Sequence, residues 1–247
     1  MLGGVGLTLF FFGGPGCPLT PWRSHSLDTG ALRAVIAEAQ QQEQHSGQLR
    51  RSLAALLPGL HPAILLPPED EAEALYLFVH HYIELVPDAL DQAARLARSE
   101  AVDEVVVPLL QLATNHFLAC ARQRPESVGL AALLDPAYLA HRLLDEGEGY
   151  CLLFNGRHLQ ERESLQANLI VQQLLGEQFS LDLEAVVDEA CRALQQARSR
   201  TRPRPGGVRL LRRPCLAARF GLRLYLPGMT PLSGRVLPFP DPAPAPR

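Results

Sequence analysis

The sequence predicts an all-α fold: a compact bundle of seven or eight helices that occupies residues 26–198. Apolar residues recur there at the three- and four-residue spacing of a helix face, and helix-capping residues stand where these stretches begin. No repeat of fixed period and no convincing strand pattern accompanies them. With 47% hydrophobic residues in 247, the composition favours one domain with a sizeable core and appendages.

The first half of the domain is expected to hold four helical segments. Asp28 and Thr29 are good N-cap residues for the first, which is either one long helix or two helices joined near Gly47. The last of the four contains Pro108, which predicts a kink or a fresh start because proline lacks the backbone donor. The predicted segments span residues 28–57, 68–86, 88–98 and 102–122.

The second half is expected to hold four more helices. Asp135 followed by Pro136 is typical of an N-cap and the first helical position. Gly176 is expected to close one helix and Ser180 to cap the last one. The predicted segments span residues 127–134, 136–154, 161–175 and 181–198.

Both ends of the chain differ from this middle in composition. We expect residues 1–25 to be an unstructured N-terminal extension and residues 199–247 to be an Arg/Pro-rich disordered tail. Ten prolines and a single acidic residue, Asp241, lie beyond Ala197. We therefore predict that the termini are either disordered or non-native-like, meaning that their sequence agrees with none of the local patterns of a folded chain. The intact mass of the native protein, 27.1 kDa for the full chain, tests this interpretation.

Charge is divided between the domain and the tail. All 23 basic residues are Arg, and the absence of Lys excludes a P-loop lysine and a Schiff-base lysine. Residues 26–197 carry 11 Arg against 25 Asp and Glu, whereas residues 198–247 carry 11 Arg against one Asp. The tail could bind nucleic acid by neutralising phosphates, or it could fold back on the acidic domain. The candidate phosphate-binding residues are Arg198, Arg200, Arg202, Arg204, Arg209, Arg212 and Arg213.

The five cysteines indicate a reducing environment. They are odd in number, widely spaced and never arranged as Cys-x-x-Cys, so neither a disulfide framework nor a zinc site is indicated. The apolar stretch from Leu2 to Phe12 is too short to span a bilayer and lacks the positively charged start of a signal peptide. We therefore expect a cytoplasmic protein without a membrane span.

One weak constellation of metal-ligating residue types is present. His80 and Glu84 are four residues apart on one predicted helix, and His141 and Asp145 repeat this spacing on another. Facing helices that present His and carboxylate are typical of non-haem di-iron bundles, and His80-x-x-x-Glu84 resembles one element of the hemerythrin pattern. The His-x-x-x-His pair of that family is missing. The candidate iron ligands are His80, Glu84, His116, His141 and Asp145.

No motif for nucleophilic catalysis or nucleotide binding is present in the sequence. We therefore expect a protein-binding or regulatory module without catalysis and without a cofactor, acting on a protein partner that the sequence does not identify. A metal-binding bundle and a nucleic-acid binder that uses the tail are the two alternatives.

Overall fold

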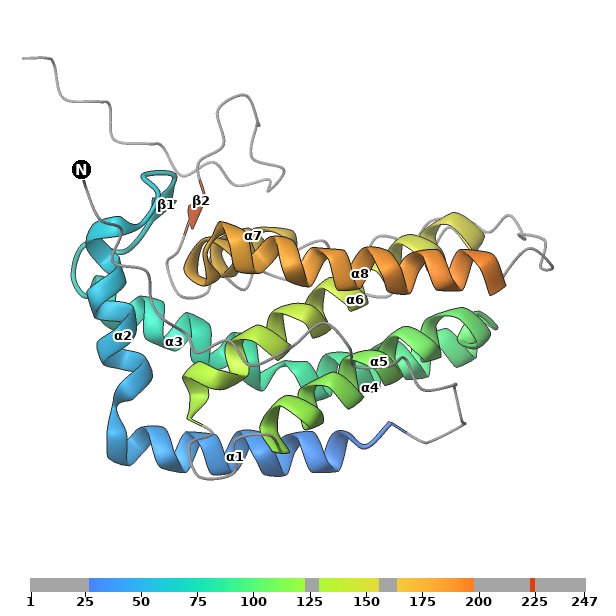
Figure 1. Ribbon diagram of the computed structural model, residues 1–247, viewed down its shortest axis with the longest axis horizontal. Coiled ribbons are helices and arrows are strands. Elements are labelled where there is room, and N and C mark those ends of the chain that lie inside the picture. The colour runs from blue at the N-terminus through green and yellow to red at the C-terminus, as the bar shows by residue number, and fades with distance from the viewer. Residues whose placement is uncertain (1–26, 123–128, 156–163, 198–222, 225–247) are drawn as a thin grey trace, which may run out of the picture.

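The all-α prediction is confirmed by the computed structural model, which describes residues 27–122, 129–155, 164–197 and 223–224. Eight α-helices lie in this part of the chain (Figure 1). Their bounds are α1 Thr29–Ser46, α2 Gln48–Leu56, α3 Glu71–Glu84, α4 Val86–Ser99, α5 Asp103–Arg122, α6 Leu134–Asn155, α7 Ser164–Leu175 and α8 Glu177–Ala197. Two 3₁₀ turns, η1 Leu57–Gly59 and η2 Leu130–Leu133, follow α2 and precede α6.

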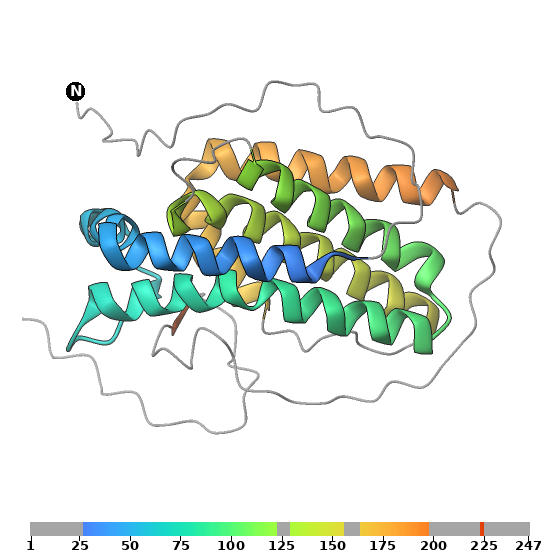
Figure 2. The ribbon, with the colours of Figure 1, turned by 90° about the horizontal axis from the view of Figure 1, so that it is seen from below.

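Helix α6 is the centre of the bundle. It packs against α5, α4, α7, α8 and α3, and the long helices run side by side when the molecule is seen from below (Figure 2). Its buried face includes Tyr138, Leu139 and Leu143, which belong to one continuous apolar core shared with the other helices. Neighbouring helices remove these apolar side chains from water, and this packing is the main source of stability for α6.

A glycine separates α1 from α2. Gly47 has φ +55°, a left-handed conformation that glycine adopts without strain, and its N–H donates to the carbonyl of Glu43 at 2.7 Å. The buried carboxylate of Glu43 accepts hydrogen bonds from the N–H groups of Leu49 and Arg50 at 2.9 and 3.1 Å. Glu43 therefore satisfies the first turn of α2, and α2 turns sharply away from α1.

Several predicted boundaries need correction. Asp70, rather than Pro68, precedes α3 and accepts from the N–H of Glu73 at 3.1 Å. Helix α5 continues through Pro108, so no fresh start occurs there. Ser180 is not an N-cap, because α8 already begins after Gly176, and Ser180 is buried within it. Within the described part of the helix predicted over 127–134, residues Leu130–Leu133 form the 3₁₀ turn η2. This turn leads directly into α6, so Asp135 lies in the first turn of α6.

A short two-stranded pairing accompanies the helices. Strand β1 (Ile64–Leu65) pairs antiparallel with β2 (Arg223–Leu224), and Ile64 lies opposite Leu224. These strands differ from the prediction that no strand is present, because two residues are too few to show a period in the sequence. All other residues of the predicted N-terminal extension and C-terminal tail lie outside the described part. None of the helices in the described ranges contains an uncharged hydrophobic stretch of the length that a bilayer span requires.

Candidate functional site

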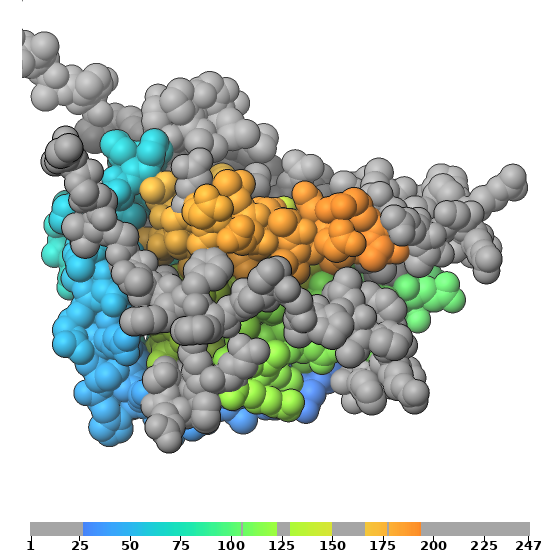
Figure 3. Space-filling view, in the orientation of Figure 1, coloured from blue at the N-terminus to red at the C-terminus, as the bar shows by residue number. Residues whose placement is uncertain are grey.

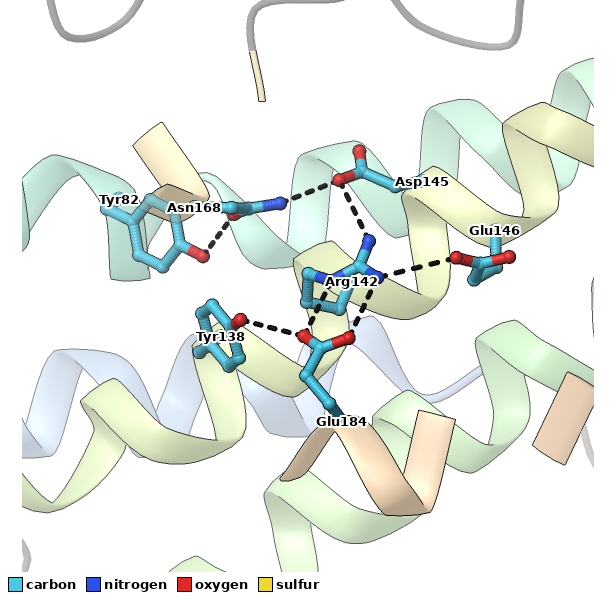
Figure 4. Close-up of polar contacts among 7 residues, drawn as sticks. All are labelled: Tyr82, Tyr138, Arg142, Asp145, Glu146, Asn168 and Glu184. Carbon is cyan, nitrogen blue, oxygen red and sulfur yellow. Dashed lines mark hydrogen bonds and ion pairs between the residues drawn. The ribbon is translucent and has the colours of Figure 1, made fainter. Parts of the chain in front are cut away.

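Helices α6 and α8 are joined by a guanidinium–carboxylate pair. Arg142 of α6 donates from Nε to Oε1 of Glu184 at 2.7 Å and from Nη2 to Oε2 at 2.9 Å (Figure 4). The two side chains are partly buried, with 21% and 28% of their surface exposed. Two parallel charge-assisted hydrogen bonds set the distance and the orientation between their helices, so this pair holds α8 in a defined position on the bundle.

The pair is part of a polar network that reaches four helices. Tyr138 of α6 donates to Oε1 of Glu184 at 2.7 Å. On the other side, Tyr82 of α3 donates to Asn168 of α7 at 2.6 Å, and Asn168 donates to Asp145 of α6 at 2.7 Å. Figure 4 shows these side chains pointing toward one another from α3, α6, α7 and α8. The network therefore links α7 and α8 to α3 and α6.

Carboxylates outnumber the cation in this network. Besides Glu184, Arg142 lies 3.5 Å from Asp145 and 3.4 Å from Glu146. The hydrogen bonds with Glu184 raise the pKa of Arg142 above its usual value. Burial acts to raise the pKa of Glu184, but the hydrogen bonds from Arg142 and Tyr138 outweigh it and leave that pKa lowered. Arg142 and Glu184 are therefore both charged at neutral pH.

Two phenols and one imidazole near this pair are neutral at the same pH. Burial raises the pKa of Tyr82 and of Tyr138, so both phenols keep the protons that they donate. Burial lowers the pKa of His141 to about 4, which leaves its imidazole uncharged. A general acid or base works best with a pKa near the operating pH, and the pKa values of these three groups are all displaced from it. The arrangement is suited to holding helices together rather than to moving protons.

The structure does not assemble the five predicted metal ligands into one group. His141 uses Nε2 for a 2.9 Å hydrogen bond with the carbonyl of Tyr82, and Asp145 belongs to the network of Figure 4. His116 lies next to Cys120 on α5, with Nε2 and Sγ 3.5 Å apart. Among the described residues, no three His, Cys, Asp or Glu side chains stand close enough to hold a metal ion together.

His80 and Glu84 form a separate pair on α3. Nδ1 of His80 and Oε2 of Glu84 are 3.9 Å apart, and His81 lies nearer to the same carboxylate, at 3.4 Å. The helical spacing thus brings His80 near Glu84 as predicted. Neither residue forms a metal-binding group with the other predicted ligands, which lie on α5 and α6. The arginines proposed to bind nucleic acid, Arg198 to Arg213, lie outside the described residues.

The outer side of α8 is the second feature of this region. Its inner side buries Leu183, Val187 and Ala190, whereas Leu181 is 54% exposed and Val186 is 38% exposed. The orange surface of this helix is open to view in the upper part of the molecule (Figure 3). Sequence reasoning did not single out these two residues. Leu181 falls off the three- and four-residue spacing of the inward-facing positions, but Val186 lies three residues after Leu183 and four before Ala190, so spacing alone does not mark it as exposed.

Comparison of the chain with models of known protein families, with curated proteins and with solved structures finds no match. A functional inference must therefore come from the geometry of this chain itself.

Proposed function

We propose that this protein is a protein-binding module of the cytoplasm that presents the outer side of α8 to a partner. The observation that supports the proposal is the exposure of two large apolar side chains, Leu181 and Val186, on a helix whose opposite side is packed on α6 and α7. Removal of such side chains from water is a main source of binding free energy. The five cysteines, odd in number and never arranged as Cys-x-x-Cys, fit the reducing environment of the cytoplasm.

The network beneath α8 supports the same proposal. Because Arg142 donates two hydrogen bonds to Glu184, α8 is already ordered before a partner binds. A pre-organised surface loses less conformational entropy on binding than a mobile one, which favours affinity. In this proposal the polar network supports the binding surface and does not carry out a reaction.

The test starts from the full-length protein as bait in cells that express it natively. A protein recovered with it is then purified, and its affinity is measured for the wild-type chain and for the double variant Leu181→Glu and Val186→Glu. We expect binding to weaken at least about tenfold, since each buried apolar side chain contributes on the order of 1.5 to 3 kcal/mol.

A matched control is available on another helix. Leu77 of α3 is 41% exposed, so Leu77→Glu introduces the same kind of change away from α8. This variant is expected to bind the partner as the wild type does. If the α8 variant binds as tightly as the wild type, or if Leu77→Glu weakens binding equally, the outer side of α8 is not the binding surface.

Nucleic-acid binding through the tail is a second candidate, and the observation that favours it is the charge of residues 198–247, with 11 Arg against one Asp. A mobility-shift assay with and without these residues tests it. We expect binding only with the tail present and a steep loss of affinity with added salt, because neutralised phosphates release counterions. A response to salt that is flat would count against this candidate.

A further inference from the structure

The outer side of α8 carries an excess of negative charge. Asp182, Asp188 and Glu189 are exposed there, and Arg192 is the one exposed cation that the structure describes on this helix. Nη1 of Arg192 lies 3.0 Å from Oε2 of Glu189, so its charge is already shared with a carboxylate of the same helix. This side of α8 therefore presents apolar side chains beside exposed, negatively charged carboxylates.

The apolar and acidic groups occupy adjoining turns. Leu181 and Ala185 are one turn apart, as are Asp182 and Val186, so these four exposed residues form two neighbouring rows along the first half of the helix. Asp188 and Glu189 follow one turn further along. The small side chain of Ala185, between Leu181 and Val186, leaves room for another backbone to approach closely.

We propose that the occupant of this surface is a basic amphipathic helix of another protein, with its apolar side on Leu181, Ala185 and Val186. Its Arg or Lys side chains then reach Asp182 and Asp188. The argument is charge complementarity: a partner with positive charges beside its apolar side gains attraction where a neutral or acidic one gains none or is repelled. This inference rests on the proposed function and names the chemical class of the partner.

A second copy of the same chain is a poor occupant for this surface. Two α8 helices placed face to face would bring three exposed carboxylates of one copy against three of the other. Only one arginine on each side, already paired with Glu189, would offset them. Like charges set against one another destabilise an interface, so self-association through α8 is disfavoured.

The experiment uses the full chain and two synthetic peptides of about 18 residues, which is five helical turns. One peptide has Leu on one side and Arg on the other, and its twin has Glu in place of every Arg. Binding is measured by fluorescence anisotropy at low and at physiological salt. We expect the basic peptide to bind at least about tenfold more tightly than its acidic twin and to weaken with added salt.

Two triple variants separate a local effect from overall charge. The first variant neutralises three carboxylates of α8 by Asp182→Asn, Asp188→Asn and Glu189→Gln. It is expected to lower the affinity for the basic peptide about tenfold or more. The control, Glu38→Gln, Glu71→Gln and Glu104→Gln, removes three exposed carboxylates from α1, α3 and α5 and is expected to change binding less than about twofold. The basic-partner proposal is overturned if both variants weaken binding equally or if the two peptides bind alike.

The remaining outcomes distinguish the two proposals. If the peptides bind alike while the variant with Leu181→Glu and Val186→Glu still loses the purified partner, the proposed function stands and only the basic character of the partner is refuted. If the wild-type protein sediments as a dimer that Leu181→Glu alone converts to a monomer, a second copy is the occupant and the inference is wrong.

Discussion

Arg142 and Glu184 lie 42 positions apart in the sequence, yet the guanidinium of one meets both carboxylate oxygens of the other at 2.7 and 2.9 Å. This contact is the main polar link between α6 and α8. A pair that is mostly withdrawn from water is sensitive to the loss of either member, because the remaining charge is left without compensation.

Arg142→Ala is expected to lower the free energy of unfolding by about 2 to 3 kcal/mol, measured by chemical denaturation. The control is Arg192→Ala on α8, which removes an exposed ion pair and should cost about 0.5 kcal/mol or less. The double variant Arg142→Ala with Glu184→Ala should lose clearly less than the sum of the two single variants. Additive losses would show that the two residues do not act as a pair.

Stability is expected to fall in mild acid because of His141. Its pKa is about 4 in the folded protein, below the ordinary value near 6.5, so the unfolded chain binds the proton more readily. The stability contributed by the neutral imidazole is present above pH 6.5 and is lost as the pH falls toward 4, by up to about 3 kcal/mol in total. Denaturation of His141→Gln over this range should show a flatter profile. An unchanged profile would refute the assignment to His141.

A second loss of stability is expected at lower pH from Glu184. Its folded pKa is lowered, so its contribution is present above the pKa of the unfolded glutamate, about 4.3, and is lost as the pH falls through the folded value. Glu184→Gln should remove this part of the acid dependence while leaving the part between pH 6.5 and 4.5 intact. Equal changes in both ranges would indicate a general loss of structure instead.

The cap of α2 gives a further test. Glu43→Ala removes the buried carboxylate that accepts from Leu49 and Arg50, and it is expected to lower the free energy of unfolding by about 1 to 3 kcal/mol. Glu38→Ala, at an exposed position of the same helix, should change it by less than about 0.5 kcal/mol. Similar losses for both variants would contradict the role of Glu43.

The metal-binding alternative can be tested by elemental analysis of protein purified from its native source. Because His141 is engaged with Tyr82 and Asp145 with Asn168, we expect less than about 0.1 equivalent of any transition metal. A stoichiometric metal that is lost in both His80→Ala and His141→Ala would show that the predicted ligands come together under other conditions.

Some helix caps and breaks could be predicted from the sequence, whereas other helix boundaries depend on tertiary packing. Asp28 caps α1 as expected, with its carboxylate 2.9 Å from the N–H of Ala31, and Gly47 divides two helices. Ser180 has the chemistry of a cap, yet it lies buried within α8, because the turn after Gly176 had already started the helix. Propensity is a weak guide where packing competes with it.

The candidate site shows the same division more sharply. Helical spacing predicted that His80 and Glu84 share a side of one helix, but no local rule indicates that Tyr82 donates to Asn168, 86 positions away. Nor does helical spacing separate Val186, which stays partly exposed to water, from Leu183 and Val187, which are buried.

The helical class and most helix positions follow from local patterns of residues, because periodicity and capping act within a few neighbouring residues. The pairing of Arg142 with Glu184 and the exposure of one side of α8 follow instead from how the helices pack in three dimensions. Burial and pairing depend on which helices pack together, and in this chain that choice brings together residues many turns apart.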